Sequence, residues 1–70
     1  METKKNEITQ SKEYESYKIT YSGSHVPHRR ETLKGANNFA DRLLKQRKHG
    51  EIEGVWYNEN GIQFDLIREF

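Results

Sequence analysis

The chain has 70 residues, enough for one domain and too few for two. Its 12 basic and 11 acidic residues leave a net charge of +1, which excludes the broad positive excess of dedicated nucleic-acid binders. Any electrostatic function must therefore come from a local cluster. The lack of cysteine excludes disulfides and thiolate zinc sites and favours a reducing compartment, so we expect a cytoplasmic protein.

The first thirteen residues differ in composition from the rest of the chain. They carry charges but no apolar run, so they predict neither a signal peptide nor a membrane span. We expect residues 1–13 to form a flexible tail and residues 14–70 to form a single small α+β domain.

The first regular element is a strand from Glu15 to Ser22, where polar and apolar residues alternate as in a half-buried strand. Its apolar positions are Tyr17, Ile19 and Tyr21. The next segment, residues 22–28, collects serine, glycine and Pro27, so it is expected to be a connection without regular structure.

An amphipathic helix is predicted from Leu33 to Gly50, beginning near residues 29–32. One side of it is apolar and consists of Leu33, Ala36, Phe39, Ala40, Leu43 and Leu44. The opposite side is polar and mostly basic, with Asp41 as its only acid, and consists of Lys34, Asn38, Asp41, Arg42, Lys45, Lys48 and His49. Gly50 is expected to end the helix by taking the left-handed conformation after the C-cap.

The last twenty residues predict a β-hairpin around the sequence Asn58-Glu59-Asn60-Gly61. A two-residue Asn60-Gly61 loop would pair Tyr57 with Phe64 and would mix polar and apolar residues on each face. A three-residue loop with a glycine bulge pairs Trp56 with Phe64, Gly54 with Leu66 and Ile52 with Arg68. We choose the second register because it separates the faces better, with Ile52, Trp56, Ile62, Phe64 and Leu66 on the inner one.

Together these elements predict a β-α-β-β fold in which the helix packs on one face of a three-stranded mixed sheet. The first strand should lie parallel to one hairpin strand and antiparallel to the other. The expected core combines the inner residues of the strands with the apolar side of the helix: Tyr17, Ile19, Tyr21, Leu33, Ala36, Phe39, Ala40, Leu43, Leu44, Ile52, Trp56, Ile62, Phe64 and Leu66.

The basic side of the helix predicts a nucleic-acid-binding site, because lysines and arginines bind phosphates. The predicted contact residues are Arg29, Arg30, Lys34, Arg42, Lys45 and Lys48. The alternative is structural, since solvent-facing helix positions are commonly filled by lysine and arginine as good helix formers. Acidic residues of the hairpin would confine phosphate contacts to the helix and the loop before it.

The loop before the helix carries Ser24, His25, Val26, Pro27 and His28 beside two arginines. The helix N-terminus after it could hold an anion, or Ser24 or Thr32 could simply cap the helix. Two histidines supply too few ligands for a metal, so we expect neither a metal nor a cofactor.

The same loop is similar at Gly23-Ser24-His25 and Val26-Pro27-His28 to fragments of the HicA-type toxins, which are small ribonucleases. The resemblance implies His25 as a catalytic histidine. It covers six residues and the following helix, and the two fragments are separated in that family but contiguous here. Because a lone histidine lacks an identified partner, we expect a protein that is not an enzyme.

The hairpin predicts a second functional surface, because one helix can cover only one face of the sheet. Val55, Tyr57 and Ile67 are expected on the uncovered face, where an apolar patch is typical of a protein interface. This alternative function is an interaction or inhibitor module of the kind encoded by phages and mobile elements, with a host protein or a second copy of the chain as partner.

Overall fold

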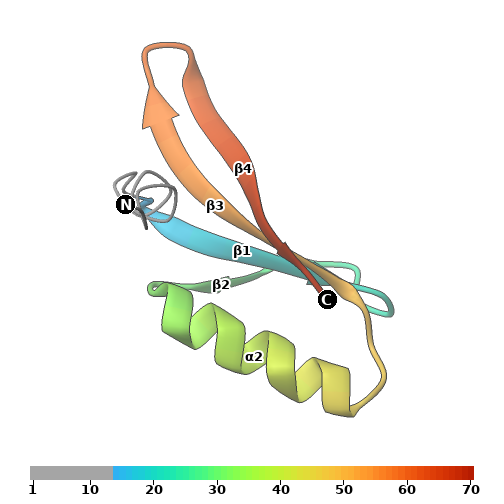
Figure 1. Cartoon of the computed structure of the whole chain (residues 1–70). Coiled ribbons are helices and arrows are strands. Elements are labelled where there is room, and N and C mark those ends of the chain that lie inside the picture. Colours follow the sequence, from blue (N-terminus) through green and yellow to red (C-terminus); the bar gives the residue numbers. More distant parts are fainter. Residues whose placement is uncertain (1–13) are drawn as a thin grey trace, which may run out of the picture.

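The computed structural model describes residues 14–70, and the predicted N-terminal tail, residues 1–13, lies outside this part. The described chain forms a small α+β domain, as predicted. Its elements are β1 (Ser16–Tyr21), β2 (His28–Arg30), α2 (Leu33–Lys45), β3 (Gly50–Asn58) and β4 (Gly61–Glu69). Figure 1 shows the helix beneath one face of the sheet and the β3–β4 hairpin projecting beyond it.

The sheet has four strands in the order β2-β1-β3-β4, and all neighbours are antiparallel. The prediction of three strands in a mixed sheet is therefore wrong. The cause is β2, a three-residue strand that runs back along β1 and pairs Lys18 with Arg29. Because β2 reverses the chain before the helix, β3 returns antiparallel to β1, and no crossover between parallel strands is needed.

The helix is shorter than predicted at its C-terminal end. It begins after Thr32, whose Oγ1 accepts a hydrogen bond from the Gly35 N–H at 3.0 Å, as predicted for one of the two candidate caps. It ends at Lys45, and Arg47 rather than Gly50 adopts the left-handed conformation, with φ 64°. The Arg47 and Lys48 N–H groups bond back to the Leu44 and Leu43 carbonyls at 2.9 Å, the pattern of a Schellman motif.

The pairing near the hairpin turn differs from both predicted registers. Asn58 pairs with Gly61, so the loop consists of Glu59 and Asn60, and Val55 lies opposite Phe64. A register shift between Ile52 and Glu53 then restores the predicted pairing of Ile52 with Arg68. One extra residue in β4 thus shifts the pairing by one position between the base of the hairpin and its turn.

This shift moves the β4 residues Ile62, Phe64 and Leu66 to the face away from the helix, where each side chain is exposed. Their assignment to the core is therefore wrong. The buried core consists of Ile19, Ala36, Ala40, Leu43 and Ile52, with Tyr17, Tyr21, Phe39, Ile67 and Phe70 packed partly against it. Leu33 and Leu44 are also more exposed than predicted, since the helix covers β1, β2 and β3 but not the whole hairpin.

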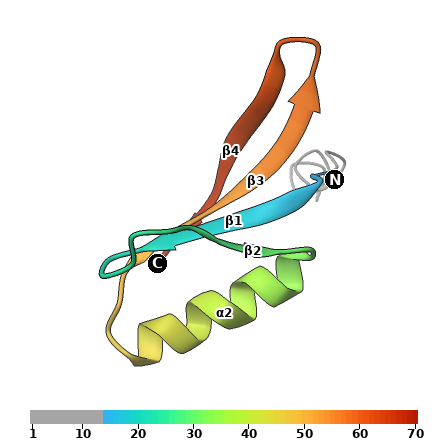
Figure 2. The same cartoon turned by 180° about the vertical axis from the view of Figure 1, so that it is seen from behind.

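The opposite face of the sheet carries no second layer in the described chain, as Figure 2 shows from behind. The molecule measures 36 × 32 × 16 Å along its principal axes and is therefore thin in one direction. Within residues 14–70, no helix is both long and apolar enough to cross a membrane.

Candidate functional site

Basic and aromatic side chains meet along the side of α2 that borders the edge strand β2. The His28 ring stacks on Tyr21 with centroids 5.4 Å apart and lies 5.1 Å from the Phe39 centroid. Two arginines flank Phe39, with the Arg30 Cζ 4.6 Å and the Arg42 Cζ 5.7 Å from its centroid. We call this region the basic–aromatic surface; it consists of Tyr21, His28, Arg30, Phe39, Arg42 and Lys48.

The strand register explains why these side chains meet. His28 and Arg30 alternate with Arg29 along β2, and they pair with Ile19 and Tyr17 on the side of the sheet that faces the helix. Phe39 and Arg42 lie three residues apart on α2, so they are neighbours on one side of the helix. Lys48 follows the helix end, and its Nζ lies 6.0 Å from the Tyr21 centroid.

The charges on the two sides of the helix are unequal. Asp41, the single acid of α2, accepts a hydrogen bond from Arg68 of β4 at 2.9 Å, and Arg68 also donates to Asn37 at 2.8 Å. Among the described residues, no carboxylate lies within ion-pair distance of the five cations on β2, α2 and the segment after it: Arg30, Lys34, Arg42, Lys45 and Lys48. Lys34 and Lys45 share the side of the helix that carries Asp41, so the positive charge on the side that borders β2 comes from Arg30, Arg42 and Lys48.

The structure divides the six predicted nucleic-acid-binding residues. Arg30, Arg42 and Lys48 meet around the aromatic rings, and Lys34 and Lys45 are exposed on the same helix. Arg29 is separated from them, because it pairs with Lys18 on the other face of the sheet. There its guanidinium lies 3.9 Å from Glu31, and both side chains are largely exposed.

The loop between β1 and β2 is ordered by local contacts. The Ser24 hydroxyl donates to the Val26 carbonyl at 2.9 Å, while His25 is exposed. The Thr32 hydroxyl accepts a hydrogen bond from the Gly35 N–H at the helix N-terminus, which favours a helix cap over an anion site in this region. Within residues 14–70, no three His, Cys, Asp or Glu side chains are grouped as metal ligands.

Three members of the basic–aromatic surface, Tyr21, His28 and Phe39, were not among the predicted site residues. Tyr21 and Phe39 were assigned to the core, and each does pack partly against it while also facing the cations. His28 was assigned to a loop. The available signal was the His28-Arg29-Arg30 triplet, whose alternation places its first and third residues on one face, but three residues are too few to indicate a strand from pattern alone.

A second feature is the uncovered face of the sheet, which we call the open face. Val55 and Tyr57 both lie on this face, but only Tyr57 is exposed as predicted, because Val55 is 7% exposed; Ile67 instead packs against the core on the helix side. The bulge in β4 explains this correction, because it reverses the alternation at that point. Tyr57, Ile62, Phe64 and Leu66 are 60, 48, 45 and 56% exposed, so together they form an apolar strip on the hairpin.

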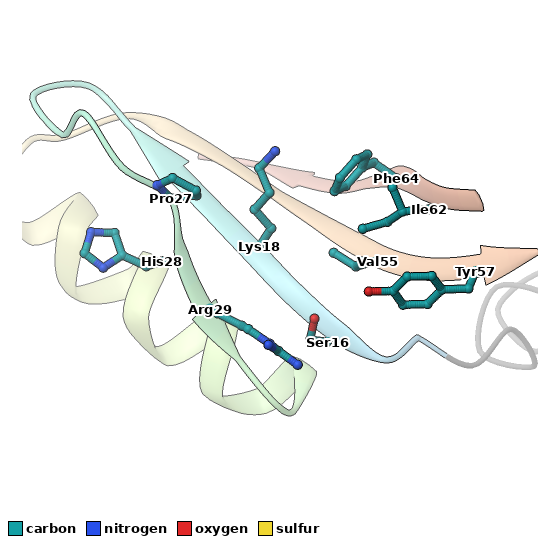
Figure 3. A pocket seen from close by; sticks show the side chains of 9 residues that line it. All are labelled: Ser16, Lys18, Pro27, His28, Arg29, Val55, Tyr57, Ile62 and Phe64. Atoms are coloured by element: carbon teal, nitrogen blue, oxygen red, sulfur yellow. The ribbon is translucent and has the colours of Figure 1, made fainter.

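A shallow cavity of about 230 Å³ lies on the open face between the hairpin and β2 (Figure 3). Val55, Ile62 and Phe64 line its apolar side, and Ser16, Lys18 and Arg29 line the opposite side. The Lys18 ammonium lies 4.5 Å from the Phe64 centroid and 3.6 Å from a Glu53 carboxylate oxygen. Ser16 is 5% exposed, and its hydroxyl makes no hydrogen bond with the described residues.

Comparison with known proteins finds no matching family model, curated protein or solved structure.

Proposed function

We propose that this protein acts by binding the phosphate backbone of a nucleic acid through the basic–aromatic surface. The observation that supports this proposal most directly is the unequal distribution of charge around the helix. Arg68 holds the single acid of α2 on the β4 side, while Arg30, Arg42 and Lys48, which surround the rings near β2, have no carboxylate partner among the described residues. A local excess of positive charge on a protein of net charge +1 favours a polyanion as ligand.

The aromatic rings support this function by positioning the cations. A guanidinium over a ring is held in place by the cation–π attraction, and its N–H groups that have no other acceptor can donate to an anion. In Arg30, Nη1 donates to the Arg29 carbonyl oxygen at 2.7 Å, so Nε and Nη2 are the donors that remain for an anion. Arg30 and Arg42 both lie near Phe39, so they present two planar donors from one region. Arginine donors in such an arrangement suit phosphate oxygens, which accept two parallel hydrogen bonds.

The small area of this surface predicts a modest affinity with a measurable salt dependence. Each phosphate contact releases counterions, so about three contacts correspond to a slope near −3 when the logarithm of the binding constant is plotted against that of salt. Glu51, Glu53 and Glu69 lie on the open face, where they repel phosphate. Binding is therefore expected on the helix side only.

The test compares Arg30→Ala with Arg29→Ala in titrations of fluorescent single-stranded and duplex DNA and RNA at several salt concentrations. These neighbouring arginines carry the same charge but lie on opposite faces of the sheet. We expect Arg30→Ala to reduce the salt slope by about one and Arg29→Ala to leave it unchanged. Circular dichroism spectra of both variants control for folding.

Two results would contradict the proposal: no binding of wild-type protein to any of the four probes at low salt, or equal losses in the two variants. The RNA probe recovered after long incubation also tests whether the protein is an enzyme. We expect it to remain intact, whereas cleavage that is lost in His25→Ala would favour the toxin-like alternative.

A further inference from the structure

We propose that the open face packs against the same face of a second copy of this chain, so that two sheets form a sandwich with the helices outside. Of the basic–aromatic surface, His28 alone also lines the cavity on this face, and the cations of the proposed function do not take part in the contact. Sheets in such sandwiches pack about 10 Å apart with nearly aligned strands. The second copy would provide the layer that the described chain lacks on this face.

Charge complementarity favours a second copy as the occupant. The open face is positive on one half and negative on the other: its cations are Lys18 on β1 and Arg29 on β2, whereas its acids are Glu51, Glu53 and Glu69 on β3 and β4. A two-fold axis parallel to the strands, between the two sheets, places the β1–β2 half of each copy over the β3–β4 half of the other. Lys18 then lies over Glu53 of the other copy, and Arg29 lies over the β4 strand that carries Glu69, at a level two residues away. A partner of uniform charge would be repelled by one half.

The ion pairs within the chain do not engage every charged residue of the open face equally. Lys18 already pairs with Glu53 within the chain, at 3.6 Å. Arg29 meets Glu31 only at 3.9 Å, with side chains that are 68 and 78% exposed, so water screens this pair. Glu69 makes no ion pair with a described residue. The same two-fold arrangement brings Arg29 toward the half of the partner that carries Glu69.

The shape of the open face is also self-complementary. The cavity of about 230 Å³ lies between the hairpin and β2, while Leu66, which does not line it, is 56% exposed on β4. Across the sheet, Leu66 pairs with Glu53, Glu53 pairs with Lys18, and Lys18 pairs with Arg29. Leu66 and Arg29 therefore lie at the same level along the strands. Rotation about an axis parallel to the strands preserves this level and directs Leu66 of each copy toward the β2 side of the other, beside the cavity.

The test is the mass of the protein in solution, measured by sedimentation equilibrium from about 10 μM to about 1 mM. We expect wild-type protein to form a dimer within this range. Phe64→Lys places a charge in the centre of the apolar strip and is expected to raise the dimer dissociation constant by about tenfold or more. Leu44→Lys is the matched control, because Leu44 is also an exposed apolar residue but lies on α2.

A charge exchange tests the orientation of the two copies. Arg29→Glu is expected to weaken the dimer, and Arg29→Glu combined with Glu69→Lys is expected to recover part of the loss. Pairing of two β4 edges would not respond to Arg29, which lies on the opposite edge of the sheet. Near-ultraviolet circular dichroism verifies that each variant is folded.

The proposal is overturned if the folded wild-type protein remains monomeric throughout this range. It is also overturned if a dimer forms that responds to Leu44→Lys but not to Phe64→Lys, or one that is insensitive to Arg29→Glu.

Discussion

Arg47 is the single non-glycine residue in the described chain with a positive φ, 64°. In this left-handed conformation a Cβ approaches the following carbonyl oxygen, which costs about 1 kcal/mol, and glycine avoids the cost. We therefore expect Arg47→Gly to raise the free energy of unfolding by about 0.5–1 kcal/mol, measured by urea denaturation. Arg47→Ala removes the same charge but keeps the Cβ, so it should not stabilise; equal effects of the two variants would contradict this explanation.

Tyr14 is a residue whose environment favours the neutral phenol. Its hydroxyl donates to the Asp65 carboxylate at 3.0 Å. Burial, this hydrogen bond and the Asp65 charge raise the pKa of Tyr14 from 10.0 to about 12. Because the folded pKa exceeds the unfolded one, the corresponding stabilisation is complete below pH 10 and is lost as the pH rises through about 12.

Urea denaturation at increasing alkaline pH tests this assignment. We expect the wild-type stability to fall more steeply between pH 10 and about 12 than that of Tyr14→Phe, which has no phenol to ionise. Tyr57→Phe, which removes an exposed tyrosine on the open face, should retain the steep fall. Parallel curves for wild type and Tyr14→Phe would show that the Tyr14 phenol is not coupled to folding.

At the scale of elements, Gly50 lets β3 approach β1 closely. A Cβ at this position would lie 2.7 Å from the Tyr21 Cα and would also meet the Thr20 carbonyl oxygen, so the backbone would have to move. We expect Gly50→Ala to lower the free energy of unfolding by about 1–3 kcal/mol in a thermal or urea denaturation experiment. Glu51→Ala, at the neighbouring exposed position, should change stability much less; similar losses would show that β3 accommodates the added carbon.

The elements differ in how well the sequence predicts them. The alternation of Tyr17, Ile19 and Tyr21 and the apolar side of α2 extend over several residues, so β1 and the helix were predicted close to their observed positions. Strand β2 contains only His28, Arg29 and Arg30. It is a strand because it pairs with β1, and its own sequence pattern is too short to predict one. The end of α2 was placed at Gly50 because glycine is the usual left-handed residue, whereas Arg47 takes this position.

In the hairpin, the strands were predicted correctly but the residues on each of their faces were not. Its two strands were predicted, but a one-residue difference in register exchanges the faces of Ile62, Phe64 and Leu66. Choosing the register that buries the most apolar residues assumes that all of them are covered. Here the helix is too short to cover the hairpin, so the apolar strip remains exposed.

At the scale of the whole molecule, the two candidate surfaces lie on opposite sides of one sheet, and β2 contributes to both. His28 and Arg30 face the helix side while Arg29 faces the open side. Charge content predicted the basic side of the helix, but only the fold separates Arg29 from Arg30 and assigns Asp41 to Arg68. The positive surface therefore depends on tertiary contacts that no local pattern contains.

The projecting hairpin has a consequence for motion within the native state. Its turn lies beyond the helix, so few buried contacts oppose separation of β3 from β4 there, whereas Ile52 is fully buried and Arg68 is bound to α2 near the other end. Local opening requires less free energy where fewer contacts are lost. Amide hydrogens should thus exchange with deuterium fastest near residues 58–61 and progressively more slowly toward residues 52 and 68, and a second copy on the open face would slow this exchange along the exposed part.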